Sequence, residues 1–221
     1  MLIKFKYYIR FFYKCLIATL RYYNIYNPKY TVSSKLDFGS IAATNFLRKK
    51  IMNCTFFFEY GSGNSTIYAN NHNVKTISVE SDKNFYKYLK KKIISEYIFF
   101  DFGIVDFYSR PLHSKLNINP KIGLEYSSSI LKILEKKNVP DLILIDGRFR
   151  VLSALMVYKF FQNKNTEKIT IILDDYSNRK SYHVLSEFFE IKSIDRIAVM
   201  IPKKNKDISN ELIEKYSLDF N

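Results

Sequence analysis

The chain has 221 residues, 47% of them hydrophobic, so it is long and apolar enough for one domain with a core, and a disordered polypeptide is excluded. Its formal net charge of +14 is compatible with an anionic partner, although an AT-rich genome also produces chains rich in Lys, Asn, Ile, Tyr and Phe. The two cysteines, Cys15 and Cys54, are too few for a disulfide scaffold and are typical of a reducing, cytoplasmic compartment.

Residues 1–36 carry half of this charge, because they hold seven basic residues and no acidic residue. The spacing of their apolar residues predicts a helix over the first 23 residues, with a broad aromatic and aliphatic face. Four basic residues fall on one narrow stripe of that helix: Lys6, Arg10, Lys14 and Arg21. No run of about 20 residues is apolar and uncharged, which excludes a transmembrane span, and the short uncharged core argues against a signal peptide.

Three roles remain open for this N-terminal helix. Residues 1–25 are expected either to lie on an acidic membrane surface, which would make the protein peripheral at the inner face of the membrane, or to pack on their own domain. Nucleic-acid binding is a third, less favoured role. Residues 1–36 are therefore assigned to an N-terminal helix and loop, and residues 37–221 to a single catalytic domain.

The remainder of the chain alternates strand-like runs with helical segments, which predicts a mostly parallel sheet with helices on both faces. The expected strands are 55–60, 75–80, 97–102, 142–145 and 169–173, followed by an antiparallel edge pair at 189–193 and 196–201. The expected helices are 40–51, a segment after Ser65, 81–95, 124–137, 148–161, 178–188 and the C-terminal tail. Ligands bind beyond the carboxyl ends of the strands in such sheets. The conspicuous acidic residues all fall there: Glu59, Glu80, Asp101, Asp146, Asp174 and Asp175.

The most informative motif is an apolar run that ends at Glu59 and is followed by Gly61 and Gly63 and then by hydroxyl residues that open a helix. The glycines allow close approach of a ligand and positive φ, and the helix that begins near Ser65 presents free N–H groups to the same place. Glu80 ends the next strand, where an acid can bind the two hydroxyls of a ribose. A plain strand-to-helix turn is the alternative interpretation.

The pattern Glu59-x-Gly61-x-Gly63-x-Ser65 resembles motif I of class I S-adenosylmethionine-dependent methyltransferases, and Glu80 matches their ribose-binding acid. The resemblance covers roughly residues 53–201 and implies a Rossmann-like methyltransferase fold with S-adenosylmethionine as cofactor. The cofactor-binding residues that it implies are Glu59, Gly61, Ser62, Gly63, Ser65, Glu80 and Ser81.

Three carboxylates follow two neighbouring strands of the expected sheet: Asp146, Asp174 and Asp175. Carboxylates gathered at one rim repel each other and need a cation, a shared proton or an arginine partner. Their arrangement resembles metal-dependent O-methyltransferases that methylate sugar hydroxyls, and the resemblance implies that the three residues bind Mg²⁺. Those enzymes have another acid where this chain has Arg148, so Arg148 and Arg150 are expected either to neutralise the acids or to bind an acidic substrate.

The Asp-Gly-Arg-Phe-Arg block that starts at Asp146 is also similar to one in uncharacterised bacterial methyltransferase-like proteins. The catalytic candidates are Asp146, Arg148 and His113, the last in the irregular stretch 103–123. His183 is a further candidate base, although a lone histidine is more often structural.

We therefore expect a cytoplasmic methyltransferase that O-methylates a sugar or glycan precursor. Two other functions remain open: a methyltransferase-like binding protein without activity, and a nucleic-acid methyltransferase. The second is disfavoured because the Asn-Pro-Pro-Tyr motif of base-amino methylation is absent. The acceptor and the oligomeric state are left undetermined.

Overall fold

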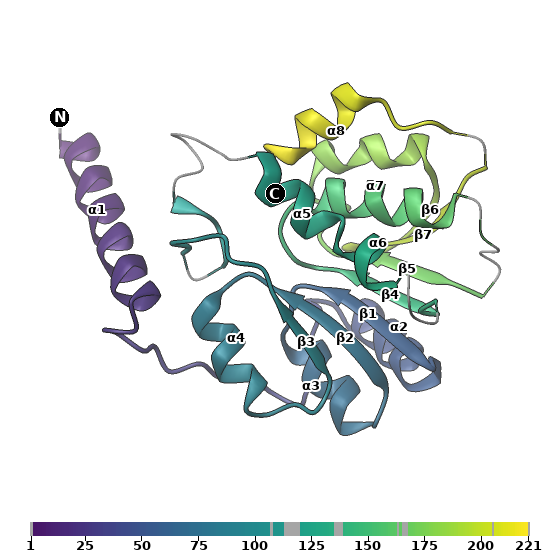
Figure 1. The fold of residues 1–221 in the computed structure, drawn as a ribbon, viewed down its shortest axis with the longest axis horizontal. Coiled ribbons are helices and arrows are strands. Elements are labelled where there is room, and N and C mark those ends of the chain that lie inside the picture. The colour runs from purple at the N-terminus through teal and green to yellow at the C-terminus, as the bar shows by residue number, and fades with distance from the viewer. Residues whose placement is uncertain are drawn as a thin grey trace.

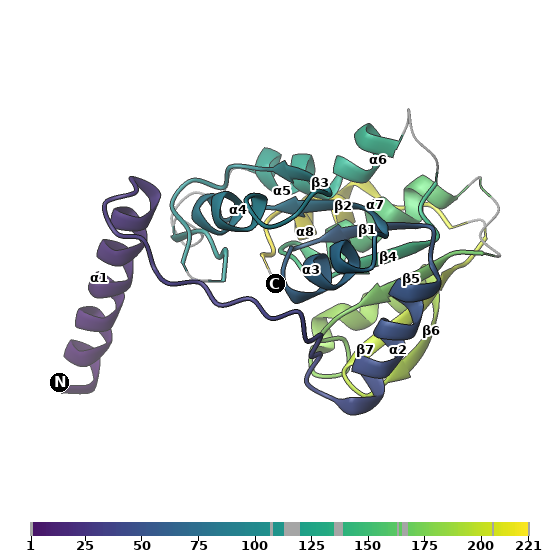
Figure 2. The ribbon, with the colours of Figure 1, turned by 90° about the horizontal axis from the view of Figure 1, so that it is seen from below.

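The fold is built on one seven-stranded sheet with helices on both faces (Figures 1 and 2). This computed structural model describes residues 2–106, 108–112, 120–134, 139–162, 164, 168–204 and 206–220, with side chains from residue 8 onward. The strand order is β3-β2-β1-β4-β5-β7-β6. From β1 the chain adds β2 and β3 on one side of the sheet, and it then adds β4 and β5 on the other side of β1. Sheets of this kind bind ligands at the point between β1 and β4 where the strand order reverses.

Five strands are parallel and the last two form the antiparallel edge pair, which confirms the predicted fold class. The parallel strands are β1 (Phe56–Tyr60), β2 (Lys75–Glu80), β3 (Glu96–Phe99), β4 (Leu142–Ile145) and β5 (Thr170–Leu173). The edge pair is β6 (Phe189–Ile194) and β7 (Ile197–Pro202).

The core has two layers, one on each face of the sheet. In β1, Phe56 and Phe58 pack on one face against α7, whereas Phe57 packs on the other against α2. All five residues of β1 are buried, as expected for a central parallel strand. The helices are α2 (Ile41–Asn53), α3 (Asn64–Asn71), α4 (Lys83–Lys90), α5 (Pro120–Ser127), α6 (Ser129–Leu134), α7 (Arg150–Phe161), the 3₁₀ helix η2 (Lys180–Glu187) and α8 (Asn210–Ser217).

Three expected helices differ from the structure. The helix expected over 81–95 ends at Lys90, and the backbone N–H of Ile94 donates to the side chain of Asn70 (2.8 Å). The helix expected over 124–137 is interrupted after Ser127. The backbone carbonyl of Ser127 accepts a hydrogen bond from the hydroxyl of Tyr60 (2.6 Å) at this interruption. The segment expected as a helix over 178–188 is 3₁₀.

The N-terminal helix α1 (Leu2–Tyr22) forms as predicted and extends away from the sheet, and an extended segment connects it to α2 (Figures 1 and 2). Its C-terminal part is fixed to the domain, where Ala18 and Arg21 are each 2% exposed. Packing into the main core begins at Leu36. None of the helices in the described ranges is long and apolar enough to cross a membrane.

Candidate active site

A cleft of about 700 Å³ opens at the carboxyl ends of β1, β2 and β4. The loop after β1 contributes Gly61 and Ser62, the end of β2 contributes Glu80 to Asp82, and the loop after β4 contributes Asp146 to Arg148. The volume suits a ligand of small-molecule or cofactor size. A second cavity of about 210 Å³ shares Gly61, Ser62 and Asp146 with the cleft and extends toward Asp174.

The loops after β1 and β4 touch through two glycines. Gly61 has a φ of +84°, and a Cβ there would lie 2.7 Å from the Cα of Gly147. A Cβ on Gly147 would in turn lie 2.0 Å from the hydroxyl of Tyr126. The positive φ expected for the motif is therefore found at Gly61. Gly63 has extended backbone instead, and a Cβ there would meet nothing within 4 Å.

This difference between the two glycines gives a matched test. Gly61→Ala should cost about 2–4 kcal/mol of unfolding free energy, because it combines strain at positive φ with overlap on the facing loop. Gly63→Ala should change stability by less than about 0.5 kcal/mol. Urea unfolding of the two variants beside the wild type checks this. Equal destabilisation by both would contradict the glycine-on-glycine contact.

Glu59 stands behind the turn and does not line the cleft. It is fully buried, and its carboxylate accepts hydrogen bonds from the hydroxyls of Ser65 (2.7 Å), Thr66 and Ser78. Thr66 also accepts the backbone N–H of Gly63 (2.9 Å), so Glu59 fixes the start of α3. The cofactor contact expected for Glu59 is thus replaced by a positioning role, while Ser65 lines the second cavity.

Burial raises the pKa of Glu59 from 4.5 to about 7, although its three hydroxyl donors oppose the shift. Because the folded state binds this proton more tightly than the unfolded chain, stability falls as the pH rises from 4.5 through 7. Between pH 4.5 and 7 the unfolding free energy of the wild type should fall by about 3 kcal/mol relative to that of Glu59→Gln, because each unit of pKa shift corresponds to about 1.36 kcal/mol. Denaturant unfolding of both proteins at pH 5 to 8 measures the difference, and parallel pH curves would refute it.

Glu80 lies at the rim of the cleft with a carboxylate that the protein holds in place. One oxygen accepts the backbone N–H groups of Ser81 (2.6 Å) and Asp82 (2.8 Å), and the other accepts the hydroxyl of Ser62 (2.5 Å). Burial raises the pKa of Glu80, and these donors oppose the shift. The backbone N–H of Ser62 and the hydroxyl of Ser109 donate to it as well (3.3 Å each), so the roughly four lone-pair sites of the carboxylate are occupied and a ligand hydroxyl would take the place of a serine hydroxyl.

The segment before the main domain also forms part of the cleft. Lys29, Tyr30 and Thr31 line it, together with Phe85 from α4. The rings of Tyr30 and Phe85 lie 5.3 Å apart in an edge-to-face arrangement. Aromatic side chains in such a wall can stack on a planar heterocycle.

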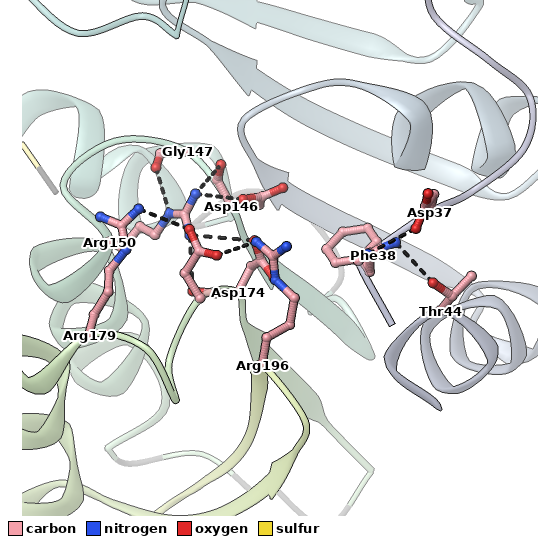
Figure 3. A network of polar contacts seen from close by, with 11 residues as sticks. Asp37, Phe38, Thr44, Asp146, Gly147, Arg150, Asp174, Arg179 and Arg196 are labelled. Carbon is pink, nitrogen blue, oxygen red and sulfur yellow. Dashed lines mark hydrogen bonds and ion pairs between the residues drawn. The ribbon is translucent and has the colours of Figure 1, made fainter. Parts of the chain in front are cut away.

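The three carboxylates after β4 and β5 meet as predicted, and arginines join them (Figure 3). Arg150 donates to Asp146 (2.7 Å), to Asp175 (2.9 Å) and to the carbonyl of Asp174 (3.0 Å). Arg196 binds Asp174 (2.8 Å) and Asp175, and Arg179 binds Asp175 (2.9 Å). We call these six residues the Asp–Arg cluster.

The Asp–Arg cluster does not fit the expected Mg²⁺ site. The cluster pairs three acids with three arginines, so the charge repulsion that would require a metal is already removed. Among the residues that the structure describes, no group of three or more His, Cys, Asp or Glu side chains is arranged so that it could hold a metal ion. The assignment of Asp146, Asp174 and Asp175 as metal ligands is therefore corrected to an ion-pair cluster, which Arg150 neutralises together with Arg179 and Arg196.

Asp146 and Arg148 nevertheless face the cleft. About a third of the Asp146 side chain is exposed there. Desolvation raises the pKa of Asp146 to about 7, with Arg150 opposing the shift and Asp174 adding to it. Burial and the neighbouring guanidiniums of Arg150 and Arg110 lower the pKa of Arg148. In the described part of the chain no carboxylate lies within ion-pair distance of Arg148, so its charge is available to a ligand.

Of the two candidate histidines, His113 lies outside the described residues. His183 is exposed on η2, with its ring 5.1 Å from that of Tyr176, and it does not line the cleft. The sequence interpretation missed Arg179, Arg196 and Asp82, the last of which lines the cleft and forms an ion pair with Arg21.

No protein-family model matches this sequence, and no curated protein matches it. Among solved structures, it is similar to a methyltransferase-like protein from Silicibacter pomeroyi DSS-3, with a TM-score of 0.67 and 23% sequence identity. The alignment covers 86% of this chain and all of the other. The chain has a methyltransferase-like fold. At this identity the likeness establishes the architecture, and the chemistry has to be argued from the cleft.

Proposed function

We propose that the protein is an S-adenosylmethionine-dependent methyltransferase that methylates an oxygen of a sugar or glycan precursor. The observation that carries the proposal is the convergence, in one cleft, of the Gly61 turn, the fixed carboxylate of Glu80 and the cleft-facing carboxylate of Asp146. Together they supply a close backbone approach, a hydroxyl acceptor and a proton acceptor.

The residues present fit this cofactor. Glu80 would accept the ribose hydroxyls, Ser62 and Gly61 would allow close approach, and the aromatic pair Tyr30 and Phe85 would contact the adenine. When bound, S-adenosylmethionine supplies an electrophilic methyl group. The protein's own contribution is alignment of the acceptor and removal of its proton.

Asp146 is the proposed general base. A pKa near 7 leaves a carboxylate that is half ionised at neutral pH and more basic than an ordinary aspartate. Arg150 holds this carboxylate through its Nη2 (2.7 Å) and so fixes the direction in which it can take a proton. Arg148 is proposed to bind an anionic group on the acceptor, because its charge faces the cleft without a carboxylate partner among the described residues.

The cofactor assignment makes the first functional prediction. Calorimetry should show that the protein binds S-adenosylmethionine and its demethylated product. Glu80→Gln should weaken both by roughly 10- to 100-fold, since a hydrogen bond to a charged acceptor contributes about 1.5–3 kcal/mol. Glu190→Gln, on an exposed position of β6, is the matched control and should bind normally. Binding of a nicotinamide dinucleotide and of neither methyl compound would overturn the assignment.

The second functional prediction concerns the base. Transfer of labelled methyl groups to phosphorylated sugars should rise with pH around an apparent pKa near 7, because Asp146 must be ionised to accept a proton. Asp146→Asn should lower turnover by roughly 100-fold or more while the affinity for S-adenosylmethionine changes little. A variant that retains the rate and the pH profile of the wild type would exclude Asp146 as the base.

A second candidate function is ligand binding without turnover. It is favoured by the Asp–Arg cluster, in which Arg150 already pairs with Asp146 and limits its freedom. Tight binding of the cofactor with no transfer to any acceptor in the panel would support this candidate over the enzyme.

A further inference from the structure

The outward part of α1 exposes a set of large apolar side chains. Their exposed fractions run from 43% to 71%, in a chain whose other large aromatics are mostly buried. They belong to consecutive turns of the helix: Ile9, Phe11, Phe12, Tyr13 and Leu16. Figure 1 shows this helix standing clear of the sheet, and Figure 2 shows the same from a perpendicular direction. Water-exposed apolar clusters of this kind mark interaction surfaces.

The helix is amphipathic. Phe12 and Leu16 are four residues apart and lie on the same side, next to the stripe formed by Ile9 and Tyr13. Arg10 and Lys14 are also four residues apart, but each precedes a residue of the Phe12 and Leu16 pair by two positions. They therefore lie on another side of the helix. Arg10 and Lys14 are exposed. Phe11 is the exception among the exposed apolar residues and lies beside Lys14. A helix with most of its exposed apolar residues on one side and basic residues on another suits the interface between lipid headgroups and acyl chains.

We propose that α1 docks on an anionic lipid surface. The apolar side, centred on Phe12 and Leu16, enters the outer part of the bilayer, and Arg10 and Lys14 reach the headgroup phosphates. The charge of the segment supports this partner, because residues 1–36 hold seven basic residues and no acid. A second copy of the chain is disfavoured as the occupant, since pairing two such helices would bring like charges together without an acid to neutralise them.

The attachment of α1 shows what such docking would do to the cleft. Arg21 pairs with Asp82 and donates to the hydroxyl of Tyr30 (2.8 Å), and Asn84 donates to the backbone carbonyl of Arg21 (2.5 Å). Asp82 and Tyr30 both line the cleft. Arg21 therefore lies on the basic side of the helix as the sequence predicts, but it is buried there and joins α1 to the cleft. A lipid-bound α1 would hold the cleft close to the headgroups.

The test is sedimentation of the full chain with vesicles made of equal parts phosphatidylglycerol and phosphatidylcholine, beside vesicles of phosphatidylcholine alone. We expect binding to the anionic vesicles, weaker binding to the neutral ones, and release by raised salt, because the charge attraction is screened within about 10 Å at 0.1 M. Failure of the full chain to bind anionic vesicles at low salt would overturn the proposal.

Two pairs of variants separate the contributions. Phe12→Ser/Leu16→Ser should lower vesicle partitioning about 100-fold, because it removes two apolar side chains from the interface. Arg10→Gln/Lys14→Gln should lower it about 30-fold on anionic vesicles, which corresponds to about 1 kcal/mol for each charge. These four side chains are exposed, so the melting temperature should stay unchanged. Ile94→Ser/Ile201→Ser and Lys159→Gln/Lys192→Gln replace exposed residues elsewhere and should bind like the wild type.

The remaining outcomes also decide the matter. Equal loss in the α1 variants and in the controls would refute a specific role for α1. A concentration-dependent dimer that is lost in Phe12→Ser/Leu16→Ser, without vesicle binding, would replace the lipid surface by a second copy of the chain.

Discussion

The close approach of the loops after β1 and β4 is the constraint on which the cleft depends. Gly61 and Gly147 meet where any Cβ would overlap with backbone or with the hydroxyl of Tyr126. Because of this contact, backbone atoms rather than side chains line the place where the two cavities adjoin. Both cavities are lined by Gly61, Ser62 and Asp146. Glu59 supports the same turn from below, through the hydroxyls at the start of α3. A ligand can then reach both Glu80 and Asp146 from one position.

The Asp–Arg cluster solves a problem that the topology creates. Parallel strands end at the same edge, so the acids after β4 and β5 are forced together. A divalent ion is one solution, and the planar guanidinium of Arg150 is another, because its donors reach Asp146, Asp175 and two backbone carbonyls at once. Removing one partner from such a buried network typically costs about 3–5 kcal/mol, so the cluster ties β4, β5 and α7 together. Asp146 is the member that keeps access to the cleft.

The parts of the fold and site that follow from local pattern could be predicted. Each strand of the parallel sheet is a short apolar run, and Gly61 and Glu80 are placed by the strand and turn that contain them. Other residues depend on pairing between distant segments. Arg196 is an example: β7 runs antiparallel to β5 and pairs Ala198 with Leu173, so the residue two positions before Ala198 falls opposite Asp175 and also reaches Asp174. The register of β7 on β5 depends on pairing between segments that are distant in the sequence, and composition does not encode it.

The ion pair of Arg21 with Asp82 is a second case in which distance along the chain hid the contact. Helical periodicity places Arg21 on the basic stripe, and only tertiary packing shows that it is buried at 2% exposure. Arg10 and Lys14 are exposed and form no ion pair with an acid in the described part of the chain. One helix thus carries charges in two environments: Arg21 is buried and joins the helix to the rim of the cleft, whereas Arg10 and Lys14 are exposed. In the proposed docking on a lipid surface, the last turn of α1 would set the orientation of the cleft, because Arg21 in that turn pairs with Asp82 at the cleft.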